Sequence, residues 1–192
     1  MKKLLYGIAA FTLLGTTAQA ELQPKEAFVH MKKVLKGEWK LSPASKQKGT
    51  TGAHENPVVK RMLGKDKVGV AYTPIGAGSS FKEDLLPNTP RWMITMYHCD
   101  DVRECTDLLA THYCVKQNQP RFIFNKEEST KNKLIFDCDT DNSEVCDSDD
   151  SHVHHIILEL SDGYKHLKSS YLVYKNGEMY DKHTIYHFDK ME

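Results

Sequence analysis

From Lys67 onward, short runs of residues that favour extended structure alternate with short turn sequences. Strands joined in sequence by such turns favour an antiparallel meander, and closing the meander into a barrel removes its exposed edges. The turns Asp162-Gly163 and Asn176-Gly177 suit tight hairpins. We therefore predict a mostly β protein, an antiparallel meander β-barrel of about nine or ten strands. The predicted strands are Val68–Pro74, Ser79–Leu85, Trp92–His98, Leu108–Cys114, Arg121–Asn125, Lys133–Asp137, His152–Leu160, His166–Tyr174 and Glu178–Phe188.

The chain before Lys67 adds a short helix and one more strand. Apolar residues at helical spacing predict an amphipathic helix over Pro24–Leu35, with a proline near its start. Gly37-Glu38-Trp39 ends this helix and opens a strand. The stretch Ser42–Asp66 lacks periodicity and is predicted as a loop with one helical turn at Val58–Leu63. Without βαβ alternation, a P-loop or a G-x-G-x-x-G run, the pattern argues against a doubly wound nucleotide-binding fold.

The first twenty residues have the three parts of a secretory signal peptide. Lys2-Lys3 is a basic n-region, Leu4–Leu14 an apolar h-region and Ala18-Gln19-Ala20 a cleavage site. The alternative, a membrane anchor, needs an apolar run of about 20 residues, and this run is shorter. We predict cleavage after Ala20, export to a periplasm or out of the cell, and a single mature domain over residues 21–192.

Charge composition bears on the class of partner. The 192 residues hold 26 Lys plus Arg and 26 Asp plus Glu. Nucleic-acid binders carry clustered basic residues that neutralise phosphates, so we predict no nucleic-acid partner. No segment after the leader approaches the length of a membrane span, so none is predicted. The predicted partner is a small molecule, and the sequence identifies no protein partner.

Export changes how the five cysteines are interpreted, because oxidising compartments favour disulfides. Cys99 and Cys105 flank one predicted turn, and Cys138 and Cys146 flank an acidic one. Opposing strands bring such pairs within bonding distance, so these two local bridges are the preferred assignment, although sequence alone leaves the connectivity open. Cys114 is then unpaired, and as a free thiol it is either a small buried apolar residue or a functional group.

The histidines form a candidate metal site. His152 and His154 lie two apart, so on a regular strand they share a face while His155 points to the other. If that face lined a barrel, the two imidazoles could bind zinc, copper or haem iron, with His98, His112 or Cys114 as further ligands. Because the chain has ten histidines, the alternative is surface or hydrogen-bonded histidines without a ligand.

Two further motifs have chemical interpretations. Asp137, Asp139 and Asp141 have the alternating spacing of the first half of a calcium loop, but the second half of that motif is absent. A solvated hairpin loop closed by a disulfide is the favoured interpretation. An enzyme could use Cys114 as nucleophile with His98 or His112 as base, although spacing identifies no third group to orient the base.

Three stretches together resemble a known family. Gly37-Glu38-Trp39 after a short helix looks like the Gly-x-Trp opening of lipocalin-like barrels. The strand Trp92–His98, followed by Thr111–Cys114 and Asn118–Arg121, resembles the MYH, THYC and NQPR motifs of uncharacterised bacterial secreted proteins with a lipocalin-like, or calycin-like, domain. The resemblance covers residues 35–188, and the chain departs from it at its two cysteine-flanked turns. It implies a barrel fold and no particular reaction.

The matching motif positions supply the predicted site residues. Alternation puts His112 and Cys114 on one face of their strand and Tyr113 on the other, while Tyr97 and His98 also take opposite faces. A polar cluster near the mouth of a hollow, apolar barrel would be a small-molecule pocket. The predicted ligand-binding residues are Tyr97, His98, His112, Tyr113, Cys114 and Arg121, and the predicted structural motif residues are Trp39, Asn118, Gln119 and Pro120.

Sequence reasoning therefore predicts an exported protein that binds a small, largely apolar molecule inside a barrel. The alternatives are a haem or metal protein, a Cys/His-dependent enzyme, and a barrel too fully packed to hold a ligand. A competing interpretation of the motif has its polar residues satisfying turn backbone groups while Trp39 stacks on Arg121 as a plug.

Overall fold

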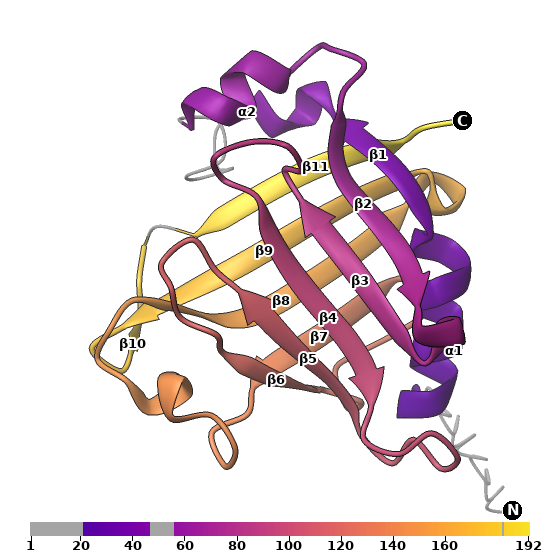
Figure 1. The fold of residues 1–192 in the computed structure, drawn as a ribbon, viewed down its shortest axis with the longest axis vertical. Coiled ribbons are helices and arrows are strands. Elements are labelled where there is room, and N and C mark those ends of the chain that lie inside the picture. The colour runs from indigo at the N-terminus through magenta and orange to yellow at the C-terminus, as the bar shows by residue number, and fades with distance from the viewer. Residues whose placement is uncertain (1–20, 47–55, 182) are drawn as a thin grey trace, which may run out of the picture.

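The computed structural model describes residues 21–46, 56–181 and 183–192. Within these residues the chain forms a closed antiparallel barrel of ten strands, with an additional two-residue strand and two helices (Figure 1). The helices are α1 Pro24–Leu35 and α2 Pro57–Met62. The strands are β1 Gly37–Leu41, β2 Val68–Ile75, β3 Ser80–Leu85, β4 Met93–Cys99, β5 Leu108–Tyr113, β6 Arg121–Phe124, β7 Lys133–Cys138, β8 His152–Ser161, β9 His166–Lys175, β10 Glu178–Met179 and β11 Thr184–Lys190. The predicted signal peptide lies outside the described residues.

Strand order confirms the predicted meander barrel. Each strand from β1 to β9 pairs with the next one in the chain, always antiparallel. β11 then lies between β9 and β1 and closes the sheet, with Trp39 opposite Lys190. The barrel strands therefore have no free edge along their length.

Local patterning predicted most elements well. The helix Pro24–Leu35 is confirmed, and the eight predicted strands between Val68 and Tyr174 agree with β2 to β9 to within one residue at each end. The predicted strand Glu178–Phe188 is wrong as a single element. Met179 pairs with Tyr174, and Thr184 pairs with Tyr171. The five residue steps from Met179 to Thr184 therefore correspond to only three steps along β9. A continuous antiparallel ladder would require equal numbers of steps on the two strands.

Alternation along the strands separates the barrel interior from its outer face. On β3, for example, Phe81, Glu83 and Leu85 are fully buried, whereas Lys82 is not. Large side chains fill the middle of the barrel instead of leaving it hollow, which restricts the space for a guest to one end. The largest of them are Trp39, Tyr72, Phe81, Tyr97, Phe122, Phe136, Tyr186 and Phe188.

Helix α1 covers one end of the barrel. Its buried face includes Ala27, Met31 and Leu35. Lys25 and Lys32 donate from α1 to backbone carbonyls in the turns after β4 and β2, at 2.7 and 2.8 Å. The opposite end, where β3 turns into β4 and β5 into β6, is not covered by this helix (Figure 1).

Trp39 anchors this closed end, and its cationic neighbour is Lys190. Its indole Nε1 donates to the carbonyl of Leu35 at 2.8 Å, and Lys190 Nζ lies 5.0 Å from the ring centroid. The competing interpretation, in which Trp39 stacks on Arg121, is wrong, because Arg121 is an exposed residue on the outer face of β6. Lys190 is the cation beside the Trp39 ring because β11 pairs directly with β1.

Two disulfides join Cys99 to Cys105 and Cys138 to Cys146, as predicted, and Cys114 is a free thiol. Both bridges fit an extracytoplasmic, oxidising compartment. In the described chain, no helix has the length and apolar character needed to cross a membrane.

Candidate functional site

A buried carboxylate occupies the centre of the barrel. Glu83 Oε2 accepts hydrogen bonds from the hydroxyls of Tyr72 and Tyr97, at 2.9 and 3.0 Å. Its Oε1 accepts from Tyr171 at 2.7 Å and from Thr95 at 3.0 Å. Two carboxylate oxygens have about four acceptor positions, so these four donors satisfy an ionised Glu83.

Burial sets the acid–base character of this network. It raises the pKa of Glu83, and the four hydroxyl bonds oppose that shift by stabilising the carboxylate. Burial, together with the negative charge of Glu83, raises the pKa of Tyr72, Tyr97 and Tyr171 well above the usual range. The three phenols therefore stay protonated and remain donors.

The network extends to His112 through Thr95. The Thr95 hydroxyl lies 2.9 Å from His112 Nδ1 and gives its one proton to Glu83, so Nδ1 must carry the hydrogen and donate to threonine. His112 is 1% exposed, and burial lowers its pKa from 6.5 to about 4. The neutral ring therefore has its lone pair on Nε2, which makes no hydrogen bond within the described residues.

A cavity of about 80 Å³ lies at the end of the barrel away from α1, and His112 lines it. Its walls combine five apolar side chains with seven that carry a polar group. The apolar lining residues are Leu85, Met93, Val115, Val153 and Val173, and the polar ones are Arg91, His112, Cys114, Lys116, Tyr171, Thr184 and Tyr186. Burial raises the pKa of Tyr186 well above its usual range, so its hydroxyl is also a donor.

The predicted ligand residues do not form one cluster. His112 and Cys114 line the cavity, and Tyr97 lies deeper, bonded to Glu83. His98 and Arg121 lie on the outer face, and Tyr113 is 44% exposed. The six residues are divided between the two sides of the barrel wall because neighbouring strand residues point in opposite directions, as the alternation predicted for Tyr97 and His98.

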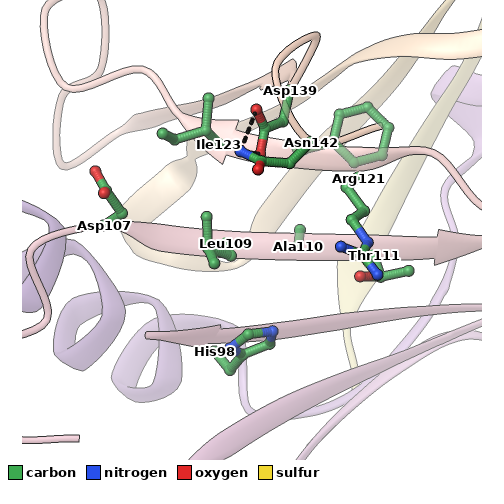
Figure 2. A pocket seen from close by; sticks show the side chains of 10 residues that line it. His98, Asp107, Leu109, Ala110, Thr111, Arg121, Ile123, Asp139 and Asn142 are labelled. Carbon is green, nitrogen blue, oxygen red and sulfur yellow. Dashed lines mark hydrogen bonds between the residues drawn. The ribbon is translucent and has the colours of Figure 1, made fainter. Parts of the chain in front are cut away.

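His98 and Arg121 instead contribute to an open groove of about 480 Å³ on the outer face of β4, β5 and β6. Figure 2 shows them on either side of Leu109, Ala110 and Thr111 of β5. His98 Nδ1 is already hydrogen bonded to the Cys99 carbonyl at 2.9 Å. The lining of this groove does not include the buried network of Glu83, Thr95 and His112.

The other NQPR residues have structural contacts. Asn118 Nδ2 donates to the Ser151 carbonyl at 3.2 Å, and the Pro120 carbonyl accepts from the backbone N–H of His112 at 3.1 Å. Gln119 is exposed. These contacts position the turn after β5 and so hold one side of the cavity rim.

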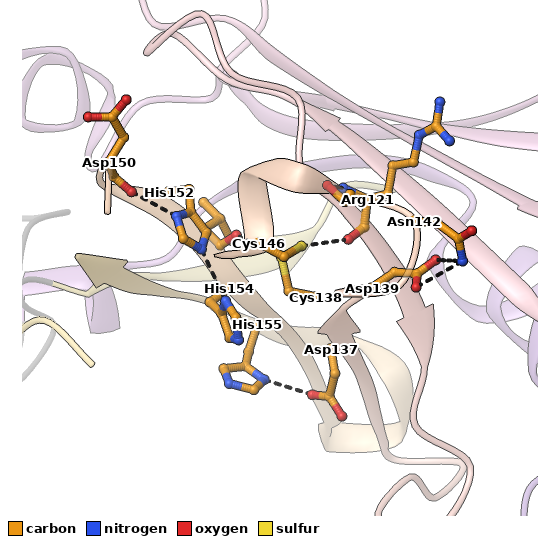
Figure 3. The surroundings of a disulfide bond; sticks show 12 residues. Arg121, Asp137, Cys138, Asp139, Asn142, Cys146, Asp150, His152, His154 and His155 are labelled. Atoms are coloured by element: carbon orange, nitrogen blue, oxygen red, sulfur yellow. Dashed lines mark hydrogen bonds and ion pairs between the residues drawn. A yellow bond between two sulfur atoms is a disulfide. The ribbon is translucent and has the colours of Figure 1, made fainter. Parts of the chain in front are cut away.

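The candidate metal histidines lie near the acidic loop rather than in the cavity (Figure 3). A bulge in β8 between Val153 and His155 breaks the regular alternation. The expectation that His155 faces away from His154 is wrong, since their ring centroids are 4.9 Å apart. His155 is paired with Asp137 at 2.7 Å.

The calcium interpretation of the acidic loop has no geometric support. Asp137 bonds to His155 and to Asn125 at 2.7 Å, whereas Asp139 accepts from Asn142. In the described part of the chain, these two carboxylates are therefore engaged separately.

The haem alternative does not fit the barrel interior, because a cavity of about 80 Å³ is far too small for haem.

Sequence reasoning missed the central residues of the site, Glu83 and Thr95. One signal was present: Glu83 alternates with the apolar residues Phe81 and Leu85, so it occupies an inward position where a charge is unusual. Its partners come from three other strands and could not be identified from local pattern.

Comparison with protein-family models and with curated proteins gave no match.

Proposed function

We propose that this protein is an exported binding protein for a small, largely apolar molecule that carries one hydrogen-bond donor. The main supporting observation is His112, a buried residue that lines the cavity and whose Nε2 has no hydrogen-bond partner in the described chain. A ligand donor that reaches this nitrogen forms a hydrogen bond that contributes up to about 1.5 kcal/mol.

The size of the cavity limits how the ligand binds. Pockets for drug-sized ligands have volumes of about 300–1,000 Å³, well above the 80 Å³ here. The donor-bearing end of the ligand would therefore enter to reach His112, and its apolar body would lie along the rim. Val115 at that rim is 39% exposed, which provides an apolar surface for such a body.

Export and family membership belong to the same proposal. The predicted leader and two disulfides support a periplasmic or secreted location, and the THYC and NQPR motifs support membership of the lipocalin-like secreted family. Mass measurement of the protein isolated from its host would find Glu21 as the first residue. A protein that retains residues 1–20 would contradict cleavage there.

The binding proposal is tested with linear primary alcohols and their methyl ethers, followed by amide shifts in ¹H–¹⁵N NMR spectra. The ether keeps the chain but loses the hydroxyl donor. We expect the alcohol to bind at least about tenfold more tightly, the effect of one buried hydrogen bond. His112→Phe should abolish this preference, since it keeps a planar ring but removes Nε2.

His98→Phe is the matched control, because it makes the same change on the outer face and should leave the preference intact. Circular dichroism establishes that both variants keep the barrel. The proposal fails if wild-type protein binds neither probe, or if alcohol and ether bind equally well.

A further inference from the structure

The bulge in β8 brings two imidazoles into a chelating arrangement outside the cavity. His152 Nε2 lies 3.1 Å from His154 Nδ1. Two nitrogens bound to one tetrahedral zinc ion at 2.0–2.1 Å would be about 3.3 Å apart. The pair is therefore already close to the separation that a shared metal ion requires.

Hydrogen bonding and stacking hold the two rings in place. His152 Nδ1 lies 2.8 Å from the Asp150 carbonyl and must donate to it, which leaves the lone pair on Nε2. A backbone carbonyl on the far nitrogen is the usual outer support of a metal-binding histidine. His154 stacks on Tyr174, with ring centroids 4.0 Å apart. His152 is 1% exposed, so the site is largely shielded.

A sulfur atom completes a set of three ligand atoms. Cys138 Sγ and one nitrogen each of His152 and His154 all lie within 4.8 Å of one another. Figure 3 shows the disulfide beside the histidines. In the oxidised protein this sulfur is bonded to Cys146, and a disulfide sulfur is a poor ligand compared with a thiolate.

We propose that His152, His154 and Cys138 form a transition-metal site for zinc or copper whose affinity is controlled by the Cys138–Cys146 disulfide. Imidazole nitrogens with one thiolate favour these soft or borderline metals over calcium or magnesium. The oxidised protein offers two nitrogen ligands, and the reduced protein offers two nitrogens and one sulfur.

The switching step requires a dithiol reductant. The dithiol loses two electrons and two protons and becomes a disulfide, while the Cys138–Cys146 bond breaks and each sulfur gains a hydrogen. Metal binding then releases the Cys138 thiol proton to solvent, while the hydrogen of His154 moves through solvent from Nδ1 to Nε2, so that both imidazoles bind the metal as neutral ligands. Oxidation reverses the sequence and releases the metal.

The chain contains a natural comparison pair. His166 Nε2 lies 3.0 Å from His187 Nδ1, and Asp189 holds His166 Nδ1 at 2.8 Å. Among the described residues, however, no third metal-binding group of histidine, cysteine, aspartate or glutamate atoms joins this pair in a compact set. Any affinity that depends on disulfide reduction should therefore belong to the Cys138 site alone.

The test titrates full-length mature protein with Co²⁺, whose thiolate complexes have a characteristic near-ultraviolet charge-transfer absorption, and then with Zn²⁺ in competition. Cys146→Ser frees Cys138 without a reductant, and the double variant Cys138→Ser/Cys146→Ser removes both sulfurs. All proteins also carry Cys114→Ser to prevent a new disulfide. We expect the single variant to show thiolate absorption at one equivalent and at least tenfold tighter binding than the double variant.

Two controls separate the histidines. His154→Phe keeps the ring stack on Tyr174 and should abolish the absorption, whereas His187→Phe should leave it unchanged. If Cys146→Ser does not fold, wild-type protein reduced with a phosphine provides the same comparison. Equal affinity of the single and double variants, or Co²⁺ binding without thiolate absorption, would overturn the proposal.

Discussion

Thr95 and His112 lie directly opposite each other on β4 and β5, and the threonine hydroxyl is 2.9 Å from Nδ1 of the imidazole. The same hydroxyl donates to Glu83. Because the hydroxyl has a single proton, it must accept the hydrogen of His112 Nδ1. This fixes the tautomer of His112 and leaves Nε2 as an acceptor at the cavity. Thr95 therefore connects the carboxylate at the centre of the barrel to the proposed ligand contact.

Replacing Thr95 with Val tests this connection. The substitution keeps the side-chain shape but removes the hydroxyl. One acceptor position on Glu83 Oε1 and the Nδ1–H of His112 then have no partner. Buried groups that lose their hydrogen bonds cost about 1–3 kcal/mol each, so we expect the free energy of unfolding in urea to fall by about 2–6 kcal/mol. Preference for the alcohol over its ether should also weaken, because the tautomer is no longer fixed.

Thr111→Val is the control for this change. Thr111 lies on the same pair of strands but faces the outer groove, so its replacement should alter stability by less than about 0.5 kcal/mol. Equal losses for the two variants would show that the buried hydroxyl has no special role.

Acid should destabilise the protein through His112. Burial lowers its pKa in the folded state from 6.5 to about 4, so the unfolded chain takes up the proton first as the pH falls. The stabilising contribution is complete above pH 6.5 and is lost progressively towards pH 4, by about 3 kcal/mol in total. Glu83 acts in the opposite sense, because burial raises its pKa in the folded state. Its contribution to the free energy of unfolding therefore decreases as the pH rises through the folded-state pKa.

The measurement compares urea unfolding at pH 7.5 and pH 4.5 for wild-type protein and His112→Phe. Titration of His154, whose pKa burial also lowers to about 4, is common to both proteins and cancels. We expect the acid-induced loss to be about 2 kcal/mol smaller in the variant. Identical losses would assign the acid sensitivity to other groups.

Cys114 distinguishes a binding protein from a thiol-dependent enzyme. The thiol is free and lines the cavity, so iodoacetamide should label it once in the oxidised protein, and an alcohol bound in the cavity should slow the labelling. For a binding protein, Cys114→Ala should keep the affinity for the alcohol within about threefold, because the donor bond goes to His112. Loss of all binding in this variant would favour a role for the thiol itself.

The local pattern of the sequence was sufficient for the barrel. Turn pairs such as Asp162-Gly163 and the alternation along each strand predicted where the strands begin and end. The same alternation predicted that Tyr97 and His98 take opposite faces. It did not reveal which of them faces inward, because both faces of the wall carry a mixture of polar and apolar residues.

The site depended on contacts that no local pattern contains. Tyr171 reaches Glu83 across 88 positions in the sequence, and Lys190 reaches Trp39 only because β11 closes the barrel against β1. At His154, one extra residue in the strand reverses the side on which each later residue lies, and the sequence has no signal for that bulge.

Trp39 and Trp92 provide a final test of how α1 is held. Both indoles donate one hydrogen bond, Trp39 to the Leu35 carbonyl at 2.8 Å and Trp92 to Asp84 at 3.0 Å. Trp39 is fully buried, however, and Trp92 is 46% exposed. Trp39→Phe should lower the free energy of unfolding by about 2–3 kcal/mol, because it leaves a buried carbonyl unpaired and a gap in the core. Trp92→Phe should cost less, about 1 kcal/mol, since its half-exposed ring loses little packing and Asp84 keeps its ion pair with Lys82. Hydrogen exchange should also quicken along α1 in the first variant alone, and equal exchange in both would contradict a role for Trp39 in closing the barrel.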